Sequence, residues 1–371
     1  MSVKETTAQQ VELRRMPIGK TIVRKLTQPP RNLLIKLLIW LYDNRAYHWV
    51  VAVPLAPLDS LFGLVYKILN LAWPVRYWQE WQSLPEPKFP LPQAEDHVPV
   101  KPEACDACDK YLASMIGTYV DADRLSALLP EGLSLDTARI HQGKHPIVLI
   151  FGYTQDLHRA FWPFPGMTYL EFLVGIPNIE LDDGKKYICR FFYLPVLRLN
   201  RFYPTLLGWL VGYRKKWSRV WATENTYSIR SLLTGRKILD AVFTPQGPTP
   251  DQVTTDGWKA TTDCWKNLLE QPNVNPFGDN QLFLHFHWEW ANAKNIEPVT
   301  ATLRVYEEIP GLSPGTYTFK GIELGLWEDQ KAPEGAVRFC SPFELLSPFS
   351  RTVLEVHEKR KAAMAAENQG P

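Results

Sequence analysis

Residues 207 to 220 read Leu207-Gly-Trp-Leu-Val-Gly-Tyr-Arg-Lys-Lys-Trp-Ser-Arg-Val220, and this stretch decides how the chain is interpreted. Two adjacent lysines, Lys215 and Lys216, follow a glycine turn inside an aromatic and apolar run. A lysine amine is a nucleophile only when it is neutral, and its ordinary pKa of about 10.4 keeps it charged at neutral pH. A reactive lysine here therefore requires surroundings that lower this pKa.

The neighbours of Lys215 can provide two such influences. Tyr213 and Trp217 can wall the amine off from water, while Arg214 and Lys216 can place positive charge beside it. Burial and a nearby cation both disfavour the ammonium form. The stretch therefore predicts an imine-forming lysine, with a solvated lysine pair at a strand end as the alternative.

Four upstream segments add a family resemblance. They are Tyr119-Val-Asp-Ala-Asp-Arg-Leu-Ser-Ala-Leu-Leu-Pro-Glu-Gly-Leu133, Tyr169-Leu-Glu171, Tyr193-Leu-Pro-Val-Leu197 and Pro204-Thr-Leu-Leu-Gly208. In this order and at these spacings they resemble the acetoacetate decarboxylase family, from about residue 110 to about residue 346. The resemblance implies a mainly β (α+β) fold with a cone-shaped β-barrel. The residues themselves predict antiparallel strands and, before the barrel, a helical extension that the resemblance does not cover.

The same resemblance implies roles for individual residues. Lys215 would form the Schiff base, Lys216 would help to depress its pKa, and Glu171 would be the active-site glutamate of a Tyr-x-Glu motif. The chain departs from the family pattern at Arg214, which replaces a proline, and at the apolar pair Trp209-Leu210, which replaces an Arg-Glu pair. We further expect substrate contacts from four residues, Tyr169, Tyr213, Arg214 and Trp217.

The implied activity is decarboxylation of a β-keto acid through a lysine imine in a closed apolar cavity, without a cofactor. Two alternatives remain on the same scaffold. One is imine chemistry without decarboxylation, such as an aldol or dehydration step. The other is non-catalytic binding of an apolar ligand, which the loss of the polar pair at Trp209-Leu210 favours.

Composition narrows the class of protein. The chain has 371 residues, 45% of them hydrophobic and 22% charged, so it can bury a large core. A net charge of +2 gives no reason to expect nucleic acid as a partner. Five scattered cysteines indicate reduced thiols in the cytoplasm rather than a disulfide framework, and Cys105-Asp-Ala-Cys108 has no second pair to complete a zinc site. We expect a homo-oligomer.

Two domains are expected, with residues 1–103 as a helical extension ending in a Pro-rich linker and residues 104–371 as the barrel with a C-terminal helix. The extension carries nine basic residues against three acidic ones within its first fifty positions. Residues 32–81 contain an apolar helix and a Trp-rich amphipathic helix, both too short to span a bilayer. They predict a peripheral contact with the inner face of a membrane, or packing against the barrel or across a dimer interface.

The barrel region predicts strands rich in β-branched and aromatic residues. They are expected at residues 111–119, 147–151, 169–175 and 187–197, followed by a meander over 218–243 and by two strands, 299–307 and 316–326, that complete the sheet. Short connections without long helices favour antiparallel pairing.

A second chemical pattern lies in Leu282-Phe-Leu-His-Phe-His-Trp-Glu-Trp290. On a strand, His285, His287 and Glu289 project from one face, and imidazoles with a carboxylate can bind a metal ion. Histidines on a half-exposed strand are more often structural, so we expect no metal site here and keep these three residues as the candidates.

Overall fold

The computed structural model describes residues 105–159, 166–182, 190–210, 213–223, 225–246, 271–277, 280–288, 295–321 and 334–346, with single residues Leu37, Pro57, Leu58, Leu61, Leu64, Trp265, Leu268 and Leu269. Most of the expected N-terminal extension and the whole of the expected C-terminal helix lie outside these residues. Within the described part of the chain, no helix is long and apolar enough to cross a membrane.

Strands dominate the described chain. In order they are β1 (Cys105–Asp121), β2 (Leu133–Leu135), β3 (Lys144–Arg159), β4 (Met167–Leu181), β5 (Phe191–Leu199), β6 (Lys215–Ala222), β7 (Thr226–Ser231), β8 (Lys237–Pro245), β9 (Asn273–Phe277), β10 (Asn280–Trp288), β11 (Asn295–Val305), β12 (Gly315–Phe319) and β13 (Gly335–Leu346). The helices are α5 (Ala122–Ser126), the 3₁₀ turn η3 (Thr137–Arg139) and α6 (Phe202–Leu210). The mainly β fold expected from the sequence is confirmed.

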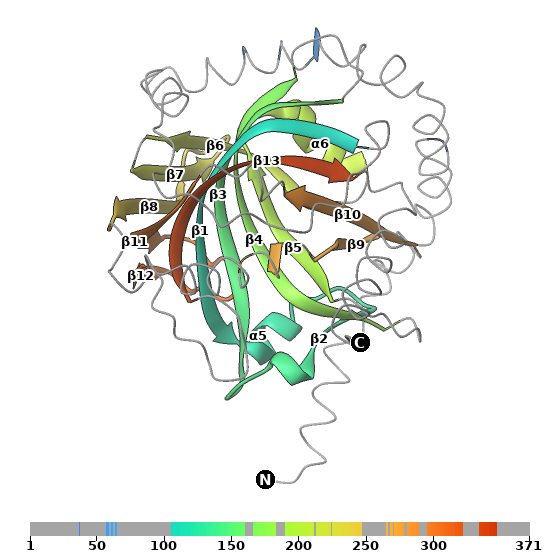
Figure 1. The fold of residues 1–371 in the computed structure, drawn as a ribbon, viewed down its shortest axis with the longest axis vertical. Helices are drawn as coiled ribbons and strands as arrows, with labels where there is room; N and C mark the ends of the chain where they lie inside the picture. The colour runs from blue at the N-terminus through green and yellow to red at the C-terminus, as the bar shows by residue number, and fades with distance from the viewer. Residues whose placement is uncertain are drawn as a thin grey trace, which may run out of the picture.

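Nine strands close into a barrel. Their order is β11-β8-β7-β6-β5-β4-β3-β1-β13, and pairing of β11 with β13 closes the ring. Figure 1 shows the long strands β1, β3 and β4 at the centre, with β7, β8 and β11 to their left. The sheet differs from the expected one in pairing and in strand content. Strand β5 pairs with β6 and with β9 in parallel, and β2, β9 and β13 are strands that the sequence did not predict.

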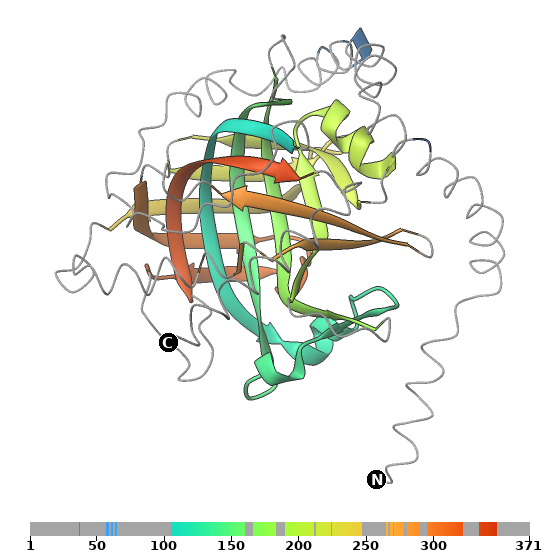
Figure 2. The ribbon, with the colours of Figure 1, turned by 45° about the vertical axis from the view of Figure 1, so that its right-hand side comes forward.

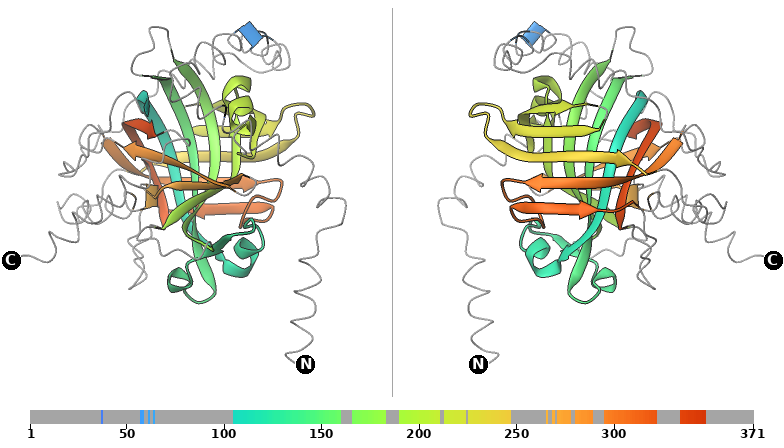
Figure 3. Two further views of the ribbon diagram at one scale, coloured as in Figure 1. Left: turned by 90° about the vertical axis from the view of Figure 1, so that its right-hand side faces the viewer. Right: turned by 90° about the vertical axis from the view of Figure 1, so that its left-hand side faces the viewer.

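A second, smaller circuit shares one wall with this barrel. It runs from β5 through β9, β10 and β13 to β1, β3 and β4, and returns to β5. Figure 1 places β9 and β10 on the right of the shared strands, opposite β7 and β8. In Figure 3 the later strands, yellow to orange, cross the long green strands at a steep angle. The shared strands therefore bury side chains on both faces.

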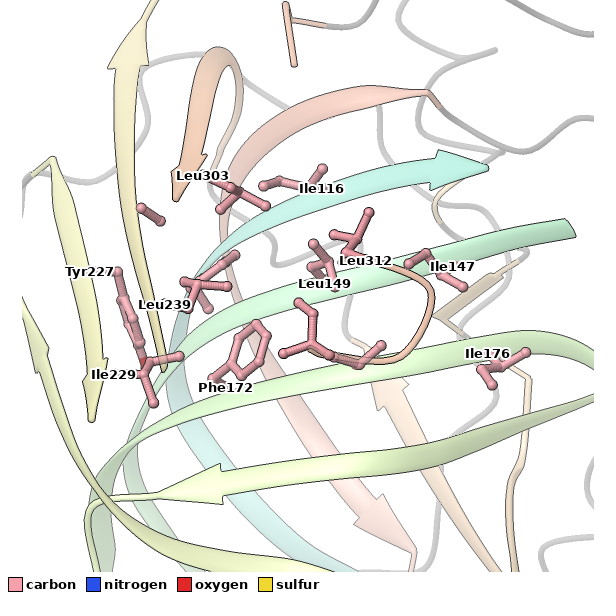
Figure 4. Packing of buried hydrophobic residues seen from close by; sticks show 14 of the residues in the cluster. Ile116, Ile147, Leu149, Phe172, Ile176, Tyr227, Ile229, Leu239, Leu303 and Leu312 are labelled. Atoms are coloured by element: carbon pink, nitrogen blue, oxygen red, sulfur yellow. The ribbon is translucent and has the colours of Figure 1, made fainter. Parts of the chain in front are cut away.

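Each circuit encloses its own apolar core. The nine-stranded barrel contains a core in which Phe172 and Tyr227 pack near Ile229 and Leu239 (Figure 4). The opposite face of the shared wall carries another core, which includes Tyr111, Leu197 and Trp265. Burial on both faces is why these strands are apolar at consecutive positions instead of alternating with polar residues.

Two short helices cap opposite ends of the long strands (Figure 2). Helix α5 begins after Asp121, whose carboxylate accepts a 2.9 Å hydrogen bond from Arg124 N, as an N-cap does. Helix α6 lies between β5 and β6 in sequence and packs against both strands. Its end leads directly into the lysine pair, so α6 fixes where Lys215 enters the sheet.

Candidate functional site

Lys215 and Glu171 lie on the same face of the shared wall. Lys215 opens β6 opposite Leu197 of β5, and Leu197 lies opposite Leu173 of β4. Side chains directly opposite each other across paired strands point to the same face. The register continues through Ile150 to Met115, so an apolar row leads away from the lysine.

Glu171 belongs to the adjacent row on this face. It lies opposite Leu199 of β5 on one side and Gly152 of β3 on the other, and Leu199 lies opposite Trp217 of β6. Glu171 is 7% exposed, so its carboxyl group is almost wholly removed from bulk water. The fold thus brings together a lysine and a glutamate that are 44 positions apart in the sequence.

Tyr111 fixes the carboxyl group of Glu171. Its hydroxyl donates a 2.8 Å hydrogen bond to Glu171 Oε1. Space for this arrangement comes from Gly152, because a Cβ at that position would overlap the Tyr111 hydroxyl. The ring of Tyr111 also packs edge-on against Phe339, with 6.1 Å between centroids. On the backbone side, the Tyr227 hydroxyl donates to the Glu171 carbonyl.

Burial shifts both ionisable groups toward their neutral forms. Lys215 keeps some accessible surface, yet burial lowers the pKa of its amine to about 8, and the opposing charge of Glu171 is the influence that raises it. Burial likewise raises the pKa of Glu171, while the Tyr111 hydrogen bond and then the Lys215 charge lower it. At pH 7 roughly a tenth of an amine with this pKa is neutral, against well under a thousandth of an ordinary lysine.

Helix α6 packs directly on the Lys215 side chain. A Cβ at Gly208 would overlap Cγ, Cδ and Cε of Lys215, so the absence of a side chain there makes room for the lysine methylenes. Two backbone hydrogen bonds close the turn: Tyr213 N donates to Gly208 O at 2.8 Å, and Lys215 N donates to Tyr213 O at 2.9 Å. The Trp209 indole N–H donates to the Lys215 carbonyl.

Of the two influences expected to lower the pKa of Lys215, burial acts and the neighbouring cations do not. Lys216 follows Lys215 on the strand, so its side chain points to the opposite face, where it is exposed. Arg214 is also exposed, and its charge acts on Tyr193. Neither cation is among the causes of the shift at Lys215. Burial, rather than a neighbouring positive charge, lowers this pKa.

The other expected contact residues are placed as follows. Tyr169 is buried on the same face as Glu171, two positions before it on β4. Tyr213 is also buried, and its hydroxyl has no hydrogen-bond partner among the described residues. Trp217 is half-buried, and its Nε1 donates to Asn200 O at 3.2 Å. Arg214 points to solvent and does not join them.

The three candidate metal ligands lie at or beyond the end of β10, where the structure describes only part of the chain. His285 and His287 lie on β10, but their side chains fall outside the described part, as does the whole of Glu289. Cys105 and Cys108 lie on β1, again with side chains outside the described part. Among the described residues no cluster of three or more metal-binding side chains occurs. The expectation that His285, His287 and Glu289 bind no metal therefore stays a prediction.

Comparison with known proteins gives similarity in structure only. No family model matches the chain, and no curated protein sequence does. Acetoacetate decarboxylase from Legionella pneumophila is similar at 14% identity and a TM-score of 0.41, over 70% of this chain and 90% of that one. The enduracididine biosynthesis enzyme MppR, complexed with pyruvate, is similar at 16% identity and a TM-score of 0.38, over 69% and 94%.

A third structure is an acetoacetate decarboxylase-like enzyme from Sphingomonas wittichii RW1. It is similar at 12% identity and a TM-score of 0.35, over 64% of this chain and 90% of that one.

Sequence reasoning missed two residues of this site. Tyr111 was assigned only to a strand, and Gly208 only to a motif before the lysines. Both act through close contacts across the fold, since 60 positions separate Tyr111 from Glu171. A glycine next to a tryptophan within an otherwise apolar helix was a usable signal for Gly208, because glycine is unfavourable inside a helix unless something must approach it.

Proposed function

We propose that this protein forms an imine between Lys215 and a small carbonyl substrate, and that a β-keto acid is then decarboxylated on it. The observation that carries the proposal is the burial that lowers the pKa of Lys215 to about 8 on the face that also carries Glu171. A buried amine that is partly neutral at physiological pH is the requirement for attack on a ketone.

The reaction would proceed through imine formation, decarboxylation and hydrolysis. Lys215 Nζ attacks the ketone carbon, and loss of water gives a protonated imine. The bond to the carboxylate carbon then breaks, carbon dioxide leaves, and the electron pair moves into the iminium nitrogen to give an enamine. Protonation of the enamine carbon, followed by hydrolysis, returns the ketone product and the free amine. These reaction steps require no cofactor.

Glu171 would carry the protons. Burial raises its pKa above the ordinary carboxyl value, which makes it a better proton acceptor and donor for this step, and Tyr111 orients its Oε1 atom. The same pair of groups would serve an aldol or dehydration reaction, which shares the imine and needs a proton carrier. Decarboxylation is favoured by the apolar row beside Lys215, since a carboxylate there is poorly solvated and is released as neutral carbon dioxide.

Reductive trapping tests this function. The full-length protein is incubated with acetoacetate or pyruvate and cyanoborohydride, and the adduct is located by peptide mass spectrometry. We expect one adduct, on Lys215, and carbon dioxide release from the β-keto acid alone. Lys215→Met should abolish both, whereas Lys216→Met should keep the adduct. Adduct formation without carbon dioxide would favour aldol or dehydration chemistry, and a protein without any adduct would serve binding.

A further inference from the structure

Lys216 does not belong to the site of Lys215, and its position poses a separate question. On β6 the positions 216, 218 and 220 share one face, and Val220 lies in the core of the nine-stranded barrel. Lys216 therefore faces the inside of that barrel at its end, where the lysine is exposed. Its Cα partner on β5 is Arg198, which places a second cation beside it.

The row that contains these cations begins in the barrel core. It runs from Phe151 to Phe172, whose ring centroids are 4.9 Å apart, and then to Arg198 and Lys216. The core end of the row is therefore aromatic and fully buried, and the outer end is cationic. Figure 4 shows Phe172 inside this barrel among Tyr227, Ile229 and Leu239.

Arg198 has donor capacity that the described residues leave unused. Its Nη1 donates to Ser218 Oγ at 3.3 Å, but its Nε is buried and finds no partner among the described residues. Ser218 is 1% exposed, and its hydroxyl donates to the Lys216 carbonyl at 3.4 Å while it accepts from Arg198, so it holds the guanidinium in place. A partly desolvated guanidinium with an unmatched N–H is costly unless an acceptor completes it.

One carboxylate acts on this group. Burial lowers the pKa of Arg198, and the charge of Glu307 partly opposes this shift. Glu307 is already in a 2.6 Å ion pair with Arg236, however, so it is shared between two cations. No ion pair is found for Lys216 within the described residues. Within the described part of the chain, Arg198 thus shares its carboxylate with Arg236, and Lys216 has none.

We propose that Arg198, Lys216 and Ser218 form a binding site for a small oxyanion, a phosphate or a carboxylate, at the end of the nine-stranded barrel. Arginine binds such groups through paired N–H donors and lysine adds a point charge, while Ser218 positions the Arg198 guanidinium. The site lies on the opposite face of β6 from Lys215 and does not depend on imine chemistry.

Thermal unfolding of the full-length protein tests the site. The unfolding midpoint is measured against inorganic phosphate and, separately, malonate, with ionic strength held constant by sodium chloride. A ligand that binds only the folded state raises the midpoint saturably. We expect such a rise for wild type, and Lys216→Met should weaken the apparent affinity by about tenfold, the effect of losing one charged contact. Whichever anion acts at lower concentration identifies the oxyanion.

Two further variants keep the result interpretable. Arg304→Met removes an exposed cation whose guanidinium lies 5.2 Å from the Tyr306 ring centroid, and it should respond to anions as wild type does. Arg198→Met should lose the response if it folds; Lys216 is exposed, so its variant decides the question if Arg198→Met does not fold. The proposal is overturned if neither anion exceeds chloride, or if Lys216→Met and wild type respond equally.

Discussion

The Tyr111 hydroxyl on β1 donates a 2.8 Å hydrogen bond to Glu171 Oε1 on β4, across the intervening strand β3. Gly152 on β3 lies between them and makes the contact possible, because any side chain there would overlap the tyrosine. The donor stabilises the carboxylate form and so lowers the pKa of Glu171 against the effect of burial. This bond therefore links the geometry of the barrel wall to the charge opposite Lys215.

Tyr111→Phe should change the pH dependence of imine formation. Without the donor the pKa of Glu171 rises, so less negative charge faces Lys215 and the pKa of its amine falls below about 8. We expect the pH midpoint of cyanoborohydride trapping to move down by about one unit. Tyr317→Phe is the control, since it removes a hydroxyl bonded to Ser313 O at 2.8 Å, away from the site. An unchanged midpoint in Tyr111→Phe would show that Tyr111 does not influence the pKa of Lys215.

Gly208→Ala should block the lysine without unfolding the barrel. Alanine normally favours a helix over glycine by up to about 1 kcal/mol, but here its Cβ overlaps the Lys215 methylenes. The displaced amine should trap a keto acid at least about tenfold more slowly, as misplaced reacting groups do. Gly315→Ala is the matched control, because its Cβ would have its nearest neighbour at 3.6 Å, on Tyr317. Equal trapping rates in both variants would contradict the packing described for α6.

His145 should make the fold sensitive to acid. Its side chain is fully buried, and burial lowers its pKa to about 4, while Nε2 has no partner within the described residues. The unfolded chain then binds the proton more readily, so stability is full above about pH 6.5 and is lost as pH falls toward 4, by roughly 3 kcal/mol. Urea unfolding of wild type and His145→Leu at pH 7 and pH 4.5 measures this.

The control for this prediction is the change in unfolding free energy between pH 7 and pH 4.5, compared in the two proteins. His145→Leu should lose less stability than wild type between the two pH values, because the buried titrating group is gone. Parallel losses in the two proteins would assign the acid sensitivity to other groups.

For the N-terminal extension, contact with a membrane surface and packing on the barrel or across a dimer interface both remain predictions, and the first can be tested. Leu58, Leu61 and Leu64 are helical and exposed, the last two at 55% each. Exposed leucines at this spacing suit a helix that lies in the headgroup region. Full-length protein should co-sediment with anionic vesicles, and Leu61→Glu should reduce the bound fraction several-fold. Leu233→Glu changes an 80% exposed leucine of the barrel and should have no effect. Equal binding by both variants would remove the extension from the contact.

The fold was predictable in its class and much of its strand pattern, since β-branched and aromatic runs mark β3, β4 and the meander β6 to β8. Strand β13 was missed because the polar residues Arg338 and Ser341, both buried, interrupt its apolar run. The parallel pairing of β5 with β6 was missed because it needs a crossover connection, and α6, the helix in that connection, is too short to be recognised as a crossover helix.

The grouping of Lys215 with Glu171 was predictable from the sequence motifs, and the electrostatics around them was not. Lys215 and Glu171 were identified from motifs, and the structure places them on one face. The role expected of Lys216 assumed that adjacent charges act on each other, whereas a strand sends adjacent side chains to opposite faces. Tyr111 could not be paired with Glu171 from the sequence, because only the register of β1, β3 and β4 brings them together.

The protonation of Lys215 itself tests the central claim most directly. Competitive labelling with trace acetic anhydride, read by peptide mass spectrometry from pH 6 to 11 against a free lysine standard, gives the pKa of this amine in the intact protein. The account predicts a midpoint near 8 for Lys215, the value that its burial produces. A midpoint at the ordinary value of about 10.4, with labelling as fast as the free standard, would contradict it.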